Sequence, residues 1–328
     1  MTSQGPTLIA LGNFDGIHRG HRRVIDPILR SPLMSSSAPT TSTASTAVVS
    51  FIPHPQEFFT GQPRSLLAPL AERRAYLYSI GVDDLILLNF DAQMAALSPQ
   101  KFIDNILVEQ LNTKYISVGQ NFRFGHRRAG TAKDLQQMAA ARGIPVHITP
   151  LHLCGGDRIS SSAIRHALTT GDVDTANRLL GRPYCLIGTV IHGQKLGRTI
   201  GFPTANLALP DDKFLPSCGV YAVHVGLTNP IKAGKDATGF WEGGKLPLSA
   251  LPPYPSLFPG VMNIGYRPTV AGIQQIAEVH LLDWSGDLYD KIIAVQLRKF
   301  LRPEQKFDGL DALKGQIAKD CDRARSFL

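Results

Sequence analysis

The feature of this sequence that most limits its fold is a change of pattern at Gly181-Arg182-Pro183. Before this point, short apolar runs typical of strands alternate with amphipathic segments typical of helices. This alternation predicts a parallel sheet covered on both faces, with ligands bound beyond the carboxyl ends of its strands. After it, strand-like runs follow one another, and only Gly309–Leu328 has helical periodicity. We therefore expect an α/β domain over residues 1–180 and a small β-barrel or sandwich with a terminal helix over residues 181–328.

Apolar periodicity predicts the individual elements of both parts. In the first part the expected strands are Leu8–Leu11, Ala47–Ile52, Leu85–Phe90, Tyr115–Val118 and Val146–Ile148. The expected helices are His21–Leu29 (interrupted near Pro27), Leu66–Ile80, Ser98–Asn112 (with Ser98 as N-cap), Thr131–Arg142, Ser160–Leu168 and Val173–Leu180. In the second part the expected strands are Tyr184–Ile191, Val220–Val225, Val261–Ile264, Ile276–Leu282 and Ile292–Leu301, the last of them half-buried and antiparallel. Ser35–Thr46 and Gly226–Pro259 have the composition of long loops.

Composition excludes several classes of protein. The chain has 328 residues, 43% of them hydrophobic and 18% charged, which is enough apolar material for real cores. Its longest apolar runs are too short to cross a membrane, and its start lacks a signal-peptide pattern. The four cysteines are scattered and form no CxxC pair, which argues against a disulfide framework or a zinc ribbon. We expect a soluble protein of the reducing cytoplasm, without a membrane partner.

The net charge of +8 is spread evenly along the chain. Each side of Leu180 carries 17 basic and 13 acidic residues, and there is no basic tail. A solvated basic surface fits this distribution better than a nucleic-acid groove, and small anionic ligands such as nucleotides are a third interpretation.

The first motif with chemical content follows directly on the first expected strand and runs from Gly12 to His21. Glycines let the backbone turn tightly and approach a phosphate, and a helix N-terminus attracts anions. Two histidines at its start can donate to one phosphate, although the same spacing occurs in metal pairs and on ordinary surfaces. The strand, turn and helix context favours phosphate binding. The candidate residues are Gly12, Phe14, Gly16, His18, Gly20 and His21.

The second motif is the densest in the chain and runs from Gly193 to Leu207. Its three glycines at four-residue spacing, with two cations between them, suggest a loop that holds phosphate, and a glycine-rich turn is the alternative. On an extended segment, Thr204 and Asn206 would point two neutral oxygens to the same side, which a Mg²⁺ site could use. The candidate phosphate-binding residues are Gly193, Lys195, Gly197, Arg198 and Gly201.

The first motif resembles the GxFDGxHxGH signature of HIGH-type nucleotidyltransferases, especially FMN adenylyltransferases, which implies a Rossmann-like domain. Ile159–Arg165 resembles the family's ISSTxIR, and Val118–Gly125 resembles VGxDFRFG, with Asn121 in place of the commoner Asp. Phe51–Pro55 resembles FdPHP, with Ile52 in place of the acid. The resemblance implies that His18 and His21 hold the triphosphate and stabilise the transition state, and that Asn121 positions the flavin. It also assigns the leaving pyrophosphate to Ser161, Ser162 and Arg165.

The second motif resembles the riboflavin kinase signature GRTIGFPTANL, and later segments match that family in order. Glu278, in the segment that resembles EvHllD, corresponds to the family's general base, although a surface glutamate on a strand is the plain alternative. The resemblance also implies a metal site at Thr204 and Asn206 and flavin binding by Arg302.

Together the two halves resemble the bifunctional riboflavin kinase/FMN adenylyltransferases, also called FAD synthetases. The resemblance implies ATP-dependent phosphorylation of riboflavin to FMN and then adenylylation of FMN to FAD, with Mg²⁺ as cofactor and ATP as co-substrate. The implied partners are riboflavin, FMN and ATP, with no nucleic acid, in a monomer or weak homo-oligomer. One rival is a kinase whose first half is inactive or transfers a nucleotide to another phosphate. The other is a flavin- or nucleotide-sensing regulator bound to nucleic acid.

Overall fold

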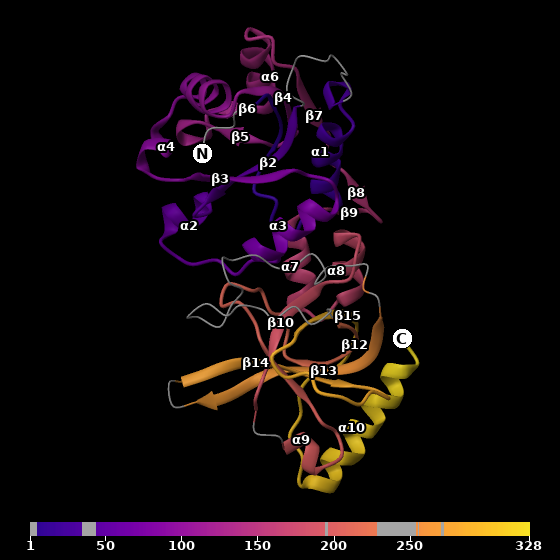
Figure 1. Ribbon diagram of the computed structural model, residues 1–328. Coiled ribbons are helices and arrows are strands. Elements are labelled where there is room, and N and C mark those ends of the chain that lie inside the picture. The colour runs from indigo at the N-terminus through magenta and orange to yellow at the C-terminus, as the bar shows by residue number, and fades with distance from the viewer. Residues whose placement is uncertain (1–4, 35–43, 194–195, 228–253, 255, 270–271) are drawn as a thin grey trace. The chain divides into compact units, whose positions relative to one another are not determined.

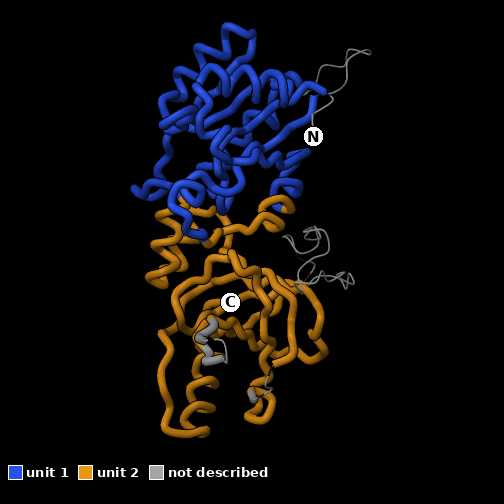
Figure 2. The backbone as a smooth tube through the Cα atoms, turned by 90° about the vertical axis from the view of Figure 1, so that its left-hand side faces the viewer, with its two compact units in different colours: residues 1–64, 76–160 blue, residues 65–75, 161–328 orange. Residues whose placement is uncertain are grey.

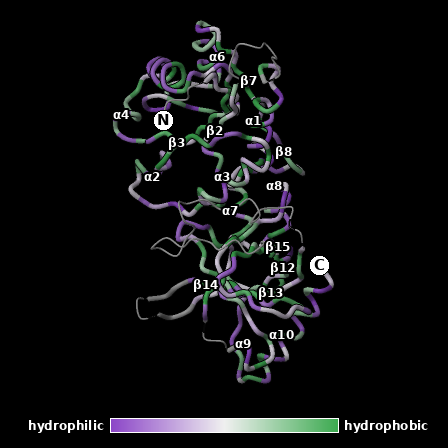
Figure 3. Tube along the Cα trace, in the orientation of Figure 1, coloured by the Kyte–Doolittle hydropathy of each residue, from purple (hydrophilic) through white to green (hydrophobic). Residues whose placement is uncertain are grey.

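A computed structural model describes residues 5–34, 44–193, 196–227, 254, 256–269 and 272–328. The chain divides into two compact units, which are coloured separately in Figure 2. The first unit comprises residues 1–64 and 76–160, and the second comprises residues 65–75 and 161–328. Both contain hydrophobic stretches interleaved with hydrophilic ones (Figure 3).

The first unit is built on a five-stranded sheet in the order β3-β2-β1-β4-β7, and every neighbouring pair is parallel (Figure 1). The strands are β1 (Thr7–Leu11), β2 (Ser45–Ile52), β3 (Asp84–Asn89), β4 (Thr113–Gly119) and β7 (Val146–Thr149). Every residue of the central strand β1 is buried, which requires apolar cover on both faces of the sheet.

Helices supply that cover. Ile9 and Leu11 of β1 face a core formed with η2 (a π-helix, Phe102–Gln110) and α6 (Ala132–Ala140). Alternate residues of a strand point to opposite faces, so Leu8 and Ala10 face the other side, where α1 (Arg19–Leu29) packs on β1 and β4. The remaining elements of this unit are η1 (Pro32–Met34), α2 (Pro55–Thr60), α4 (Ala92–Ala96), α5 (Pro99–Lys101), η3 (His126–Arg128), β5 (Arg123–Phe124), β6 (Gly130–Thr131), β8 (Leu153–Cys154) and β9 (Asp157–Arg158).

The strand order locates the functional end of this sheet. From β1 the chain adds strands on one side through β2 to β3, and it then adds β4 and β7 on the other side. The order reverses between β1 and β4, and ligands of such sheets bind beyond the carboxyl ends of the two strands at the reversal. The segments that begin at Gly12 and Gln120 leave the sheet at this point.

The second unit contains a closed antiparallel barrel in the order β10-β11-β14-β13-β12-β15. Its strands are β10 (Cys185–Ile191), β11 (Ala205–Ala208), β12 (Gly219–Leu227), β13 (Leu257–Thr269), β14 (Gly272–Leu281) and β15 (Ile292–Arg302). Closure of the barrel leaves no unpaired edge strand. The helices of this unit are α7 (Ser161–Thr169), α8 (Val173–Leu180), α9 (Leu196–Thr199), α10 (Leu310–Arg325) and the first part of α3 (Leu70–Ser79).

A buried ion pair attaches the segment 65–75 to the rest of the second unit. The ammonium group of Lys213 lies 2.6 Å from a carboxylate oxygen of Glu72 and donates to the carbonyl of Leu67 at 3.0 Å. The two charged side chains are only 1% and 7% exposed. Leu66 adds a backbone bridge to Lys213.

The expected fold class is confirmed, and several local expectations are wrong. The helix α1 continues through Pro27 to Leu29, and the helix expected from Leu66 begins only at Leu70. The helix capped by Ser98 changes to π geometry at Phe102. β15 is not half-buried, because its first six residues are buried on both sides by the barrel interior and by α8. β11 (Ala205–Ala208) was not among the expected strands, although Thr204 and Asn206 were expected on an extended segment.

The two expected loops fall largely outside the described residues, at 35–43 and at 228–253 and 255. Their described ends are strands instead of loops: β2 includes Ser45 and Thr46, β12 extends to Leu227, and β13 begins at Leu257.

Candidate active sites

The turn after β1 brings the two histidines of the first motif together. His18 is the N-cap of α1, and its Nδ1 accepts a hydrogen bond from the backbone N–H of His21 at 3.1 Å. The two imidazoles stack with centroids 3.6 Å apart and planes 12° apart. An amide N–H can only donate, so Nδ1 of His18 carries no proton, and the proton of the neutral ring is on Nε2. Nε2 is therefore the nitrogen through which His18 can donate a hydrogen bond.

The backbone of this turn is held in an unusual shape. Phe14, Gly16 and Ile17 have φ values of 49°, 83° and 40°. The left-handed region is costly for bulky residues such as Phe14 and for β-branched residues such as Ile17. Both are held in this conformation because their side chains are almost fully buried. Backbone strain of this kind is concentrated at functional sites.

Two glycines of the motif allow close approaches. Gly12 lies against the ring of Phe14, and a Cβ on Gly20 would lie 3.2 Å from the ring of His18. All six candidate residues of the first motif therefore belong to one compact turn. Asn121 follows β4 on the other side of the strand reversal, and its exposed side chain folds back toward Gly119.

The three residues expected to hold pyrophosphate belong to the second unit. Ser161 begins α7, Ser162 is exposed, and Arg165 lies one turn further along the helix. The guanidinium of Arg165 donates to the carbonyl of Ser65 at 3.1 Å and lies 5.7 Å from the ring centroid of Phe214. Within its own unit, Arg165 thus helps to hold the segment 65–75.

The barrel brings the second set of candidates together. Asn206 on β11 is the direct register partner of Glu278 on β14, which is in turn the partner of Asn263 on β13. Their strand neighbours, such as Val279 and Met262, are fully buried in the barrel interior. Alternation therefore places this polar row on the outer surface of the barrel, and its three side chains are half-buried there.

The glycine-rich segment packs against that row. A Cβ on Gly193 would lie 2.3 Å from the Asn206 side-chain nitrogen, and one on Gly197 would lie 2.3 Å from the carbonyl of Phe202 and 3.3 Å from Oγ1 of Thr204. Only glycine permits these approaches. Arg198 is exposed on α9, Gly201 has a φ of 88°, and Lys195 lies outside the described residues.

Arg302, the expected flavin-binding residue, makes a bidentate ion pair with Asp320 on α10. Its Nε and one terminal nitrogen donate to the carboxylate at 2.7 to 3.0 Å. Both groups are largely buried, and the guanidinium also lies 5.8 Å from the ring centroid of Phe307. The ion pair fixes α10 against the end of β15.

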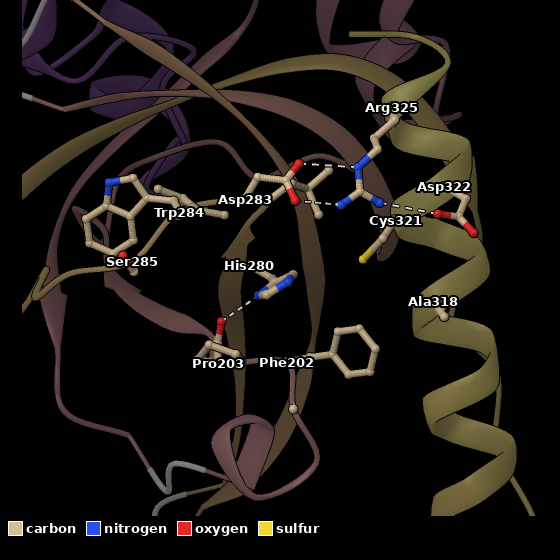
Figure 4. Close-up of a pocket in the computed structure, with 13 residues that line it drawn as sticks. Phe202, Pro203, His280, Asp283, Trp284, Ser285, Ala318, Cys321, Asp322 and Arg325 are labelled. Atoms are coloured by element: carbon tan, nitrogen blue, oxygen red, sulfur yellow. Dashed lines mark hydrogen bonds and ion pairs between the residues drawn. The ribbon is translucent and has the colours of Figure 1, made fainter.

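A pocket of about 490 Å³ lies between the end of the glycine-rich segment, the end of β14 and α10 (Figure 4). Sequence analysis gave no indication of it, because its walls come from three distant segments. Its lining residues are Gly201, Phe202, Pro203, His280, Leu281, Leu282, Asp283, Trp284, Ser285, Ala318, Cys321, Asp322 and Arg325.

The chemistry of this pocket is mixed. Arg325 donates to Asp283 at 3.0 Å and pairs with Asp322 at 3.2 Å, and its hydrogen bonds to Asp283 raise the pKa of its guanidinium. Burial raises the pKa of the Cys321 thiol to about 11, so this group is neutral at pH 7. The pocket therefore offers apolar and aromatic walls with one ion-pair network at its α10 side.

Two models of known protein families match this chain, one in each half. Residues 1–163 match the family model described as FAD synthetase, and residues 180–328 match the one described as riboflavin kinase. The fold and sites thus define a chain with a nucleotidyltransferase domain and a flavokinase domain.

Relatives with this pair of domains are similar over nearly their whole length. The bifunctional riboflavin kinase/FMN adenylyltransferase of Escherichia coli strain K12 is 42% identical over 331 residues, which cover 99% of this chain and 95% of that protein. The proteins of the same name from Pseudomonas fluorescens and Bacillus subtilis are 38% and 33% identical, and the matches cover 96% and 98% of this chain and 91% and 92% of theirs. The chain belongs to the family of bifunctional riboflavin kinase/FMN adenylyltransferases. It carries both domains of the route from riboflavin through FMN to FAD.

A crystal structure is also similar over almost the whole chain. It is titled a macrolide-efflux protein of Streptococcus pneumoniae, has a TM-score of 0.80 and 29% identity, and the match covers 99% of this chain and 96% of that one. Among the described residues of the present chain, no helix is long and apolar enough to cross a membrane.

Proposed function

We propose that the outer surface of the barrel around Glu278 phosphorylates riboflavin and that the turn after β1 adenylylates the FMN produced. The observation that carries the kinase assignment is the register pairing of Glu278 with Asn206. This pairing supports a general base beside a metal-binding amide, as phosphoryl transfer to an alcohol requires.

In the proposed kinase step, the Glu278 carboxylate accepts the proton of the ribityl 5′-hydroxyl. The freed oxygen attacks the γ-phosphorus of ATP, the bond to the β,γ-bridging oxygen breaks, and ADP leaves. The absence of a Cβ at Gly193 and Gly197 lets this segment pack directly against Asn206 and the carbonyl of Phe202, and we propose that its backbone N–H groups bind the phosphates.

The residues around Glu278 fit Mg²⁺. The ion prefers hard oxygen ligands and usually combines one or two protein groups with substrate phosphates and water. Oγ1 of Thr204 and the side-chain oxygen of Asn206 are such ligands, and Gly193 packs against the Asn206 amide more closely than any residue with a Cβ could. When bound, Mg²⁺ neutralises charge on the transferred phosphoryl group. The described residues contain no cluster of three or more His, Cys, Asp or Glu side chains that could hold a metal ion.

In the proposed adenylyl transfer, an FMN phosphate oxygen attacks the α-phosphorus of ATP and pyrophosphate leaves. The nucleophile is already an anion at pH 7, so positioning and neutralisation of charge have to supply the rate. The N–H on Nε2 of His18 and the ring of His21, at the N-terminus of α1, support this role. Ser161, Ser162 and Arg165 are proposed to bind the pyrophosphate, and Asn121 to orient the flavin.

We also propose that the pocket beside α10 receives the adenosine part of the ATP used by the kinase. Its wall includes Gly201, the last glycine of the glycine-rich segment, and its rings Phe202 and Trp284 suit a planar base. We further propose that Arg302, whose guanidinium is held by its ion pair with Asp320, binds the flavin at the end of β15.

The central test is incubation with riboflavin, ATP and Mg²⁺, followed by chromatography of the flavins. We expect FMN and then FAD. Formation of FMN alone would support the rival in which the first half of the chain is inactive.

We also make proposals about the domain boundaries, the cellular location, the oligomeric state and the partners of this enzyme. The division into an adenylyltransferase domain (1–180) and a kinase domain (181–328) is proposed together with a cytoplasmic monomer or weak homo-oligomer that binds no nucleic acid. Sedimentation measures the oligomeric state. A mobility-shift titration with random DNA and RNA tests the regulator alternative.

A further inference from the structure

His280 lies next to the proposed base on β14 and contacts the segment that carries the proposed metal ligands. It lies two residues after Glu278 on β14, and its Nδ1 is 2.7 Å from the carbonyl oxygen of Pro203. A carbonyl can only accept, so Nδ1 carries the proton and donates. Figure 4 shows this bond joining β14 to the segment that precedes Thr204.

The bond lies where the backbone ladder between β11 and β14 stops. The last recorded pair is Ala205 with Val279, and continuing the register would place Thr204 opposite His280. Pro203 has no backbone N–H and cannot extend the ladder. The His280 side chain therefore supplies the attachment that the backbone cannot.

Apolar contact reinforces this attachment. The ring of Phe202 meets the imidazole edge to face, with centroids 5.7 Å apart and planes at 80°. Residues 202 and 203 are thus both held by one side chain, immediately before Thr204 and Asn206. Leu281, the last residue of β14, and Leu282 after it are both buried, and Leu282 packs in a cluster with Cys321 and Ala324 of α10.

We propose that His280 is a positioning residue of the kinase, which sets the Pro203 carbonyl so that Thr204 and Asn206 present their oxygens to the metal. This inference rests on the proposed metal site. His280 itself touches neither the metal nor the hydroxyl in this role, and its contribution is the order of residues 202–206.

The test compares three variants in the full chain. His280→Leu removes the donor, His280→Asn keeps an N–H close to the Nδ1 position, and Asn206→Ala removes a proposed ligand without touching the anchor. Two quantities are measured. The first is the rate of amide hydrogen exchange in a peptide covering residues 200–208, without substrates. The second is the Mg²⁺ concentration that gives half-maximal FMN formation.

One neutral hydrogen bond contributes a factor of about 2 to 12. We expect His280→Leu to raise both quantities by about 5-fold, and His280→Asn to stay within about 2-fold of wild type. Asn206→Ala is expected to raise the Mg²⁺ requirement while exchange stays near wild type. Conversion of supplied FMN to FAD is expected to remain unchanged in all three.

Two results would overturn the inference: wild-type exchange and Mg²⁺ requirement in His280→Leu, or equal losses in His280→Asn and His280→Leu. An unchanged Mg²⁺ requirement in Asn206→Ala would instead overturn the metal site, while the exchange data still decide the role of His280. If His280→Leu does not fold, His280→Gln takes its place, because its amide reaches the Nε2 position and cannot supply the Nδ1 donor.

Discussion

The buried ion pair between Lys213 and Glu72 gives the sharpest stability prediction. Lys213→Met keeps the apolar stem and removes the ammonium group, which leaves the Glu72 carboxylate buried without its counterion. Its other oxygen, Oε1, is buried and has no hydrogen-bond partner among the described residues. Removal of one partner from such a pair lowers the free energy of unfolding by about 3–5 kcal/mol. For a unit of this size, each kcal/mol lowers the melting temperature by about 2–4 °C. We therefore expect the melting temperature of the second unit to fall by about 6–20 °C.

The loss depends on pH with a definite sign. Burial raises the pKa of Glu72 above its usual value, and the charge and hydrogen bond of Lys213 act to lower it. The variant keeps the first effect and loses the second, so the pKa of Glu72 in the folded state rises further. Below about pH 4.5 the carboxyl is protonated in both states and costs little. Above it, the unfolded chain ionises first, so the free energy of unfolding falls with rising pH by up to about 1.4 kcal/mol per unit.

The matched control is Lys299→Met, since Lys299 pairs with Asp174 in the same unit but the two side chains are 39% and 63% exposed. An exposed pair contributes about 0–1 kcal/mol, so this variant should melt close to wild type. Melts followed by circular dichroism at pH 5 and pH 8 measure both. The reasoning fails if Lys213→Met is no less stable than Lys299→Met at pH 8, or if its loss is larger at pH 5. The double variant Lys213→Met with Glu72→Leu should recover most of the loss.

Three further predictions concern the two reactions. Glu278→Gln keeps the shape of the side chain but accepts no proton, so riboflavin phosphorylation should slow by about 10²-fold or more with little change in riboflavin binding. Supplied FMN should still be converted to FAD, and a turnover equal to that of the wild type would assign the general base to another residue. His21→Ala should reduce FAD formation by about 10²–10³-fold and leave FMN formation intact, as chromatography of the flavins reports, and near-normal FAD formation would make His21 a surface histidine. A fragment of residues 181–328 should form FMN and no FAD, and it should melt at a lower temperature than the second unit of the full chain because it lacks Glu72 and α8. A folded fragment without kinase activity would contradict an independent kinase domain.

Local chemistry explains what the sequence could predict about the first unit. The strand, the glycine turn and the helix capped by His18 are consecutive in the chain, so their spacing already indicates the arrangement. The π geometry of residues 102–110 could not be predicted in this way, because apolar periodicity barely distinguishes it from an α-helix. The continuation of α1 through Pro27 depends on the packing of Ile25 and Ile28 in the core, which outweighs the local preference of proline.

Long-range pairing explains what the sequence could not predict about the second unit. Glu278 and Asn206 were both candidates, but strand register, which decides that they lie opposite each other, cannot be read from either segment alone. Asn263 shares their row and escaped notice for the same reason. The only signal for it was its place in a segment that resembles the kinase family. Likewise, nothing near Arg302 indicates that Asp320, on a helix further along the chain, accepts its hydrogen bonds.

The closed barrel explains why the polar row of Asn206, Glu278 and Asn263 and the pocket beside α10 both lie on its outside. A closed barrel fills its interior with apolar side chains such as Val279 and Met262, so chemistry has to occur on its outer surface, where water competes for every polar group. Order on that surface must come from attachments outside the ladder. The bond from His280 to Pro203 and the ion pair between Arg302 and Asp320 are two such attachments, one at the glycine-rich segment and one at α10. Each fixes a different element beside the candidate kinase site, so loss of either should impair phosphorylation of riboflavin.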